Sequence, residues 1–242
     1  MAAKKKKEVV AEEMTCKVSD WDQYLFGQGN HYEIYKKLGA HLTTKDGKKG
    51  TYFAVWAPRA KSVKLIGEFN NWQEDDAYEM KRLPKTGNWE IKLPAKAMKH
   101  GDLYKMSVHW EGGQGERIPA WVRRVVQDDT TKIFSAQVWD PEQKYEWKNT
   151  KFKPNTSPLL IYECHIGMGQ DAEKVGTYEE FRLNVLPRVH KAGYNCIQIM
   201  AIQEHPYYGS FGYHVSSFFA ASRRFGTPEE LKALIDEAHG LG

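Results

Sequence analysis

The chain has 242 residues, 41% hydrophobic and 27% charged, and its 35 Lys and Arg against 31 Asp and Glu leave a formal net charge of only +4. This near balance provides no broad field for attracting nucleic acid, and no run of about 18 apolar residues predicts a membrane-spanning helix. Because the N-terminus lacks the apolar core of a secretory signal and the three cysteines are too scattered for a disulfide framework or a four-ligand zinc site, we expect a cytoplasmic location.

Residues 1–31 are predicted to form a flexible tail with short helical turns. The tail carries a run of four lysines, Lys4–Lys7. Such a run can be a nucleic-acid-binding arm, but a block this short is more typical of a solvated, disordered segment. From Asp20 onwards, scattered apolar residues such as Tyr24 and Ile34 indicate only short helical turns.

Residues 32–148 contain short runs in which apolar and polar side chains alternate, which is the period of a β-strand. The runs cover residues 51–56, 63–67, 89–93 and 104–110, and turn residues rather than helical patterns lie between them. Short alternating runs of this kind indicate an antiparallel β-sandwich of about 100 residues. That size and type fit a binding module better than a catalytic one.

Trp72 stands in the segment Phe69–Trp72, where the strand pattern lapses, so we expect it on a loop. An exposed tryptophan beside amides suits a sugar, because the ring covers the C–H face of a pyranose while amides bond its hydroxyls. The alternative is that Trp72 caps the core of the sandwich. Lys105 is predicted to lie on the opposite strand face from the apolar row that begins at Tyr104.

A change of composition marks the predicted domain boundary. All eight tryptophans lie between Trp21 and Trp147. The change coincides with residues 149–158, a stretch rich in Pro, Asn, Thr, Ser and Lys that is typical of a linker. We therefore expect a second domain over residues 159–242.

The second domain shows a strand–helix–strand–helix order. Apolar runs predict buried parallel strands, and Thr-x-x-Glu capping boxes predict the helix starts. The strands are residues 159–162 and 196–200, and the capping boxes are residues 177–180 and 227–230. The first helix is expected to bend at Pro187 and to end at Gly193. Because a full (β/α)8 barrel takes about 250 residues, the pattern predicts the front part of a longer, truncated barrel.

A long loop follows the second predicted strand. Residues 203–214 read QEHPYYGSFGYH and are rich in hydrogen-bonding aromatic residues. Loops at the C-terminal ends of barrel strands build active sites, although these tyrosines could instead pack the barrel mouth. Glu204, His205 and His214 could in principle bind a metal, but their spacing matches no standard zinc pattern, so we predict no metal site.

Several motifs carry a resemblance to a known family. The segment GTYFAVWAPRAKSVKLIGEFNNW, followed by GNWEIKLP and DLYKMSV, resembles the immunoglobulin-like glucan-binding β-sandwich of glycogen and starch branching enzymes. The segments IYECHIGM and EHPYYGSFGYH resemble the start of the α-amylase-type (β/α)8 barrel of 1,4-α-glucan branching enzymes. The resemblance covers roughly Tyr32 to Gly242.

The resemblance also implies site residues. In this family the tryptophan of the FNNW turn and the lysine of the Tyr-Lys strand contact glucan, and they match Trp72 and Lys105. The tyrosine after Phe-Gly lines the sugar subsite on the non-reducing side of the cleaved bond, which matches Tyr213, with His214 beside it. The family's catalytic carboxylates come from barrel strands expected after Gly242, so no catalytic residue is assigned here.

The activity that the resemblance implies is 1,4-α-glucan branching by the full-length parent. A chain is cleaved from α-1,4-glucan and transferred to a 6-hydroxyl, forming an α-1,6 branch by a retaining double displacement without a cofactor. The implied partners are glycogen, amylose and amylopectin, and this chain alone is expected to bind glucan without branching it. The alternatives are a non-catalytic glucan-binding protein and, on the lysine run alone, a nucleic-acid binder.

Overall fold

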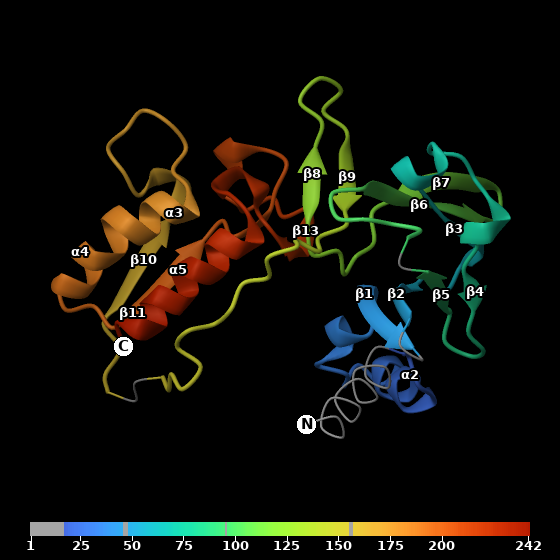
Figure 1. Cartoon of the computed structure of the whole chain (residues 1–242), viewed down its shortest axis with the longest axis horizontal. Helices are drawn as coiled ribbons and strands as arrows, with labels where there is room; N and C mark the ends of the chain where they lie inside the picture. The colour runs from blue at the N-terminus through green and yellow to red at the C-terminus, as the bar shows by residue number, and fades with distance from the viewer. Residues whose placement is uncertain (1–16, 46–47, 95, 155–156) are drawn as a thin grey trace. The chain divides into compact units, whose positions relative to one another are not determined.

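A computed structural model describes residues 17–45, 48–94, 96–154 and 157–242 of the chain (Figure 1). The chain divides into two compact units, Met1–Asp140 and Pro141–Gly242. The Lys4–Lys7 run and Cys16 lie outside the described residues. Within the described residues, no helix is both long enough and apolar enough to cross a membrane.

Helix α2, Asp20–Gly27, begins at a capping box. The Ser19 hydroxyl accepts a hydrogen bond from the Asp22 N–H at 3.1 Å, and the Asp22 carboxylate accepts one from the Ser19 N–H at 2.8 Å. A single 3-10 turn, η1, follows at Ile34–Lys36. The short helical turns predicted in this region are therefore present as α2 and η1.

The strands of the first unit form two antiparallel sheets (Figure 1). One has the strand order β1-β2-β5-β4, and the other has the order β3-β6-β9-β8 with β7 paired to β6. The strands are β1 (Gly39–Lys45), β2 (Lys48–Trp56), β3 (Ala60–Gly67), β4 (Lys81–Arg82), β5 (Asn88–Pro94), β6 (Leu103–Trp110), β7 (Gly113–Arg117), β8 (Val125–Gln127) and β9 (Phe134–Gln137). The four predicted strands lie within β2, β3, β5 and β6, so the antiparallel β architecture of this region is confirmed.

The two sheets share an apolar core. Phe53 of β2 and Tyr104 of β6 are buried, and their ring centroids lie 5.5 Å apart in an edge-to-face arrangement. Met106 and Val108 are buried with Tyr104, as the period of two requires. Lys105 alternates with this row and therefore lies on the other face of β6, as predicted.

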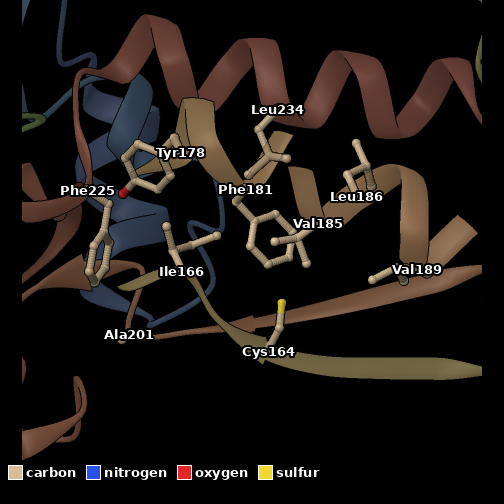
Figure 2. Packing of buried hydrophobic residues seen from close by; sticks show 10 residues of the cluster. All are labelled: Cys164, Ile166, Tyr178, Phe181, Val185, Leu186, Val189, Ala201, Phe225 and Leu234. Atoms are coloured by element: carbon tan, nitrogen blue, oxygen red, sulfur yellow. The ribbon is translucent and has the colours of Figure 1, made fainter. Parts of the chain in front are cut away.

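The second unit combines a parallel strand pair with helices. Strand β10, Ile161–His165, pairs in parallel with β11, Cys196–Met200. Helix α5, Pro228–Gly240, lies over them, and Figure 2 shows Phe181 and Leu234 packed between this helix and the strands. The first strand begins at Ile161 rather than at the predicted residue 159, and the second has the predicted bounds.

Both predicted capping boxes start helices. The Thr177 hydroxyl accepts from the Glu180 N–H at 3.1 Å, and the Thr227 hydroxyl accepts from the Glu230 N–H at 3.2 Å. Each glutamate in turn accepts from the N–H of its threonine. Pro228 occupies the first position of α5, where a missing N–H costs nothing.

The first of these helices is interrupted rather than merely bent. It consists of α3 (Tyr178–Glu180), a π-helical turn η5 (Phe181–Val185) and α4 (Leu186–Lys191). The Leu186 N–H donates to the Phe181 carbonyl five residues back, and Pro187 has no N–H to continue the α-helical ladder. The wider π turn takes up the disruption directly before the proline. Gly193, with a φ of 89°, follows the end of α4 as predicted.

The predicted loop at residues 203–214 lies within a hairpin. Strand β12, Gln203–Glu204, pairs antiparallel with β13, Ser217–Ala221. Neither strand was predicted from the sequence, because β12 has only two residues and β13 reads SFFAA, without an alternation of apolar and polar side chains. The hairpin fixes both ends of the loop.

The segment before the predicted linker belongs to the second unit. Tyr145, Lys148 and Asn149 all donate hydrogen bonds to Asp236 of α5. The predicted linker thus begins at a residue that is itself bound to α5, and the two compact units divide earlier, after Asp140. The predicted domain limits, 1–31, 32–148, 149–158 and 159–242, stay a prediction.

Candidate functional site

The side chain of Asn70 holds the turn that follows β3. Its Oδ1 accepts a hydrogen bond from the Gly67 N–H at 2.9 Å, and its Nδ2 donates to the Leu65 carbonyl at 3.0 Å. The Trp72 N–H closes the turn by donating to the Gly67 carbonyl at 2.8 Å. The Asn70 amide already makes hydrogen bonds within the turn. Of the two asparagines in the turn, Asn71 is therefore the one whose amide could bond a sugar, and it is exposed.

Two successive residues of this turn adopt the left-handed backbone conformation. The φ angle is 54° at Asn71 and 59° at Trp72. Asparagine tolerates this conformation, whereas a bulky residue held in it costs about 1–3 kcal/mol. The conformation leaves Trp72 36% exposed. Strain of this kind persists where the surrounding contacts enforce it, and it concentrates at binding and active sites.

Lys105 meets Trp72 from strand β6. Its ammonium nitrogen lies 5.8 Å from the centroid of the Trp72 ring, within the range of a cation–π interaction. The same nitrogen lies 2.7 Å from Glu116 Oε2 on β7, and the lysine side chain is only 13% exposed. The structure thus brings together Trp72 and Lys105, which the sequence places on separate elements.

A hydrogen-bonded group of polar side chains extends this surface along β6. Glu74 Oε1 accepts from the Ser107 hydroxyl at 2.6 Å and lies 2.6 Å from His109 Nε2. The hydrogen bond from Ser107, followed by that from His109, lowers the pKa of Glu74. Glu74, Ser107 and His109 were not predicted as site residues from the sequence. The available signal was the strand period, because Lys105, Ser107 and His109 occupy alternate positions and so share one face.

Tyr213 and His214 lie in the loop between β12 and β13 of the second unit, and both are exposed. Tyr213 is 79% exposed, and its N–H donates to the Ser210 carbonyl at 3.0 Å. Gly212, with a φ of 82°, packs so closely that a Cβ there would come within 2.3 Å of the Ala201 Cα. This contact fixes the backbone directly before Tyr213 and presents its ring to solvent.

Glu204 and His205 lie inside the second unit. Glu204 Oε2 accepts from the Arg223 N–H at 2.9 Å, and burial raises the pKa of this carboxyl. His205 Nδ1 lies 2.9 Å from the Gln203 carbonyl oxygen. His214 is exposed, so the three residues considered for a metal do not share one environment. Across the parts of the chain that the structure describes, no group of three or more His, Cys, Asp or Glu side chains could hold a metal ion.

Comparison with known proteins identifies the region that carries Trp72 and Lys105. Residues 37–128 match the family model of carbohydrate-binding module 48, the isoamylase N-terminal domain. The chain is 43% identical over 237 residues to a 1,4-alpha-glucan-branching enzyme of Yarrowia lipolytica, a match covering 93% of this chain and 33% of the relative. It is 49% identical over 196 residues to the corresponding enzyme of Rhizophagus irregularis, covering 78% of this chain and 28% of the relative. The chain is homologous to the N-terminal portion of 1,4-alpha-glucan-branching enzymes.

Solved structures show the same architecture. A putative alpha amylase from Salmonella typhimurium matches 85% of the chain with a TM-score of 0.67 and 24% identity, over 31% of its own length. A pullulanase from Bacillus acidopullulyticus matches 85% of the chain with a TM-score of 0.65 and 19% identity, over 28% of its own length. The fold is therefore an antiparallel β module followed by a mixed α/β segment that aligns with amylase-family structures. The chain spans about a third of the length of the curated branching enzymes that it matches.

Proposed function

We propose that Trp72 and Lys105 form a contact surface for α-1,4-glucan. The observation that carries this proposal is the strained turn that keeps Trp72 exposed while Lys105 stands over its ring. An exposed indole face covers the apolar C–H face of a glucose unit, and the ammonium is a donor for sugar hydroxyls. The match of this region to a carbohydrate-binding module supports the same ligand class.

The proposed activity of the whole protein is 1,4-α-glucan branching. Residues 159–242 would then be the first strands and helices of a (β/α)8 barrel, with the β module as an immunoglobulin-like sandwich. In the reaction, a carboxylate attacks the anomeric carbon while an acid protonates the leaving oxygen, and a glucan 6-hydroxyl then displaces the enzyme. Both steps invert, so the α configuration is retained. Among the described residues we assign no catalytic carboxylate, and Tyr213 and His214 would line a sugar subsite.

The proposed substrates are the α-1,4-glucan polysaccharides glycogen, amylose and amylopectin, and the proposed location is the cytoplasm. The β module would hold a polymer near the barrel and so raise its effective concentration there. No step of the proposed displacement requires a cofactor, because the chemistry is nucleophilic and acid–base.

Trp72→Ala tests the binding proposal. Removing the ring takes away roughly 80 Å² of apolar contact with a glucose unit, so glucan affinity is expected to fall by about 2 kcal/mol, roughly thirtyfold. The measurement is co-sedimentation with insoluble amylose, with a Kd from isothermal titration of maltoheptaose. Trp21→Ala is the matched control, since Trp21 is a more exposed tryptophan on α2 of the same unit.

Equal affinities of wild type and Trp72→Ala would remove Trp72 from the binding surface. An iodine-spectrum assay on amylose, run in parallel, tests the prediction that the 242-residue chain binds without branching. Branching by this chain would contradict our view that its catalytic carboxylates belong to the remainder of a longer enzyme.

A further inference from the structure

The segment that follows Trp72 runs along the face of β6 that carries Lys105. Trp72 meets Lys105, and Glu74, only two residues later, is bonded to Ser107 and His109. Lys105, Ser107 and His109 occupy alternate positions of the strand, so His109 lies about 13 Å from Lys105 on the same face. A row of polar side chains thus leads away from the exposed indole ring over more than the length of one glucose unit.

Glu74 and His109 hold one another in a fixed orientation. Glu74 Oε1 accepts a hydrogen bond from the Ser107 hydroxyl at 2.6 Å and lies 2.6 Å from His109 Nε2. These hydrogen bonds lower the pKa of Glu74, so its carboxylate is ionised at neutral pH. Because an ionised carboxylate can only accept hydrogen bonds, the proton of the bond between Glu74 and His109 belongs to Nε2.

Each side chain of this pair also has a polar atom that the pair itself does not use. Among the described residues, neither Glu74 Oε2 nor His109 Nδ1 forms a hydrogen bond. The two side chains are 38% and 32% exposed, so a ligand on this face can reach them. In a neutral imidazole whose Nε2 carries the proton, Nδ1 is an acceptor, as is a carboxylate oxygen. The pair therefore presents two acceptors whose positions are fixed relative to one another.

Neighbouring hydroxyls of a pyranose match such a pair, because the ring holds two O–H donors side by side. We propose that Glu74 and His109 form a second sugar subsite, which binds a later glucose unit of the same α-glucan chain that stacks on Trp72; the inference rests on the proposed glucan binding. This subsite adds to the affinity only for a chain long enough to reach it from Trp72. The surface is thereby selective for glucan chains over short oligosaccharides.

His109→Ala tests the subsite through the dependence of binding on chain length. The dissociation constants of maltose and maltoheptaose are measured by titration followed by NMR, and the readout is the ratio of the maltose constant to the maltoheptaose constant. A longer chain also offers more units that can stack on Trp72, but this statistical gain is the same in both proteins. We expect the ratio to be about fivefold smaller in His109→Ala than in wild type, with maltose binding unchanged.

Lys92→Ala is the matched control. Lys92 is an exposed polar residue on β5, in the other sheet of the same unit, so its removal is expected to leave the ratio at the wild-type value. Maltose binding also reports on the folding of His109→Ala, because maltose still requires the turn that carries Trp72.

A wild-type ratio in His109→Ala overturns the inference while leaving glucan binding by Trp72 in place. An equal loss of affinity for maltose and maltoheptaose also overturns it, because His109 would then support the shape of the surface rather than bind a separate glucose unit. If wild type binds neither sugar, the proposed function itself fails. These outcomes separate an error about the second subsite from an error about the surface.

Discussion

Replacing Asp236 with alanine is expected to lower the unfolding temperature of the second unit by several degrees. The side chain is almost fully buried on α5, and its carboxylate accepts from the Tyr145 hydroxyl at 2.7 Å and the Lys148 N–H at 2.8 Å on one oxygen. The other oxygen accepts from the Asn149 N–H at 2.9 Å. Truncation leaves these three partly buried donors without their carboxylate acceptor, while the hydrogen bond from Asn149 Nδ2 to the Asp236 carbonyl oxygen can remain. Differential scanning calorimetry of the full chain measures the effect.

Asp236→Asn is expected to lower the unfolding temperature nearly as much as Asp236→Ala. Its effect on stability is also expected to depend on pH. Burial raises the pKa of Asp236, but the hydrogen bonds from Tyr145, Lys148 and Asn149 outweigh it and lower the pKa to about 2, from the ordinary 3.8 of an aspartate. A carboxyl with a depressed folded pKa stabilises fully above its unfolded pKa and loses that contribution as the pH falls through its folded pKa. The stability difference between wild type and Asp236→Asn should therefore be constant above pH 4 and shrink toward pH 2.

Glu237→Gln is the matched control, one residue further along α5. Glu237 pairs with Arg182, but both side chains are partly exposed, and such ion pairs contribute little to stability. We expect this variant to unfold close to the wild-type temperature. If Asp236→Asn and Glu237→Gln unfold at the same temperature, the carboxylate of Asp236 does not hold residues 145–149 against α5. These residues would then belong to the linker that the composition of residues 149–158 predicts.

Local features of the fold were predicted from the sequence, whereas the attachment of residues 145–149 to α5 was not. Helix starts were predicted correctly because a capping box is complete within four residues, as at Thr177 and Thr227. Strands β2, β3, β5 and β6 were predicted because their period of two is also local, whereas β1, β4, β7, β8 and β9 were not predicted. The attachment of Asn149 to Asp236 joins residues far apart in sequence, so the Pro- and Asn-rich composition around residue 150 indicated only a linker.

Part of the candidate site was predicted from the sequence and part was not, for the same reason. Trp72 and Lys105 came from a family resemblance, and the periodicity of β6 put Lys105 on the outer face. The partners that fix the lysine and extend the surface, Glu116 and Glu74, depend on which strands lie side by side. That arrangement follows from sheet order, which a single sequence does not give.

Gly67→Ala is expected to abolish glucan binding, although it replaces neither Trp72 nor Lys105 of the proposed contact surface. Gly67 has an extended backbone, so its requirement is for space and not for a left-handed φ. A Cβ there would come within 2.3 Å of the Leu103 carbonyl oxygen and 2.7 Å of Phe69 Cε1. Overpacking of this kind costs about 1–3 kcal/mol, because the backbone of β3 or β6 must move. Urea denaturation measures the cost, and maltoheptaose titration measures the binding.

The loss of binding follows from the hydrogen bonds of the turn. Gly67 donates to Asn70 and accepts from Trp72, so a shift of its backbone releases both ends of the turn that holds Trp72 in its strained conformation. Gly27→Ala is the control, because a Cβ at the end of α2 meets nothing within 4 Å, and it should retain both stability and affinity. A Gly67→Ala protein that is destabilised yet binds glucan with wild-type affinity would show that Trp72 binds glucan without the strained turn. The φ of 59° at Trp72 would then be a consequence of packing rather than a preparation for binding.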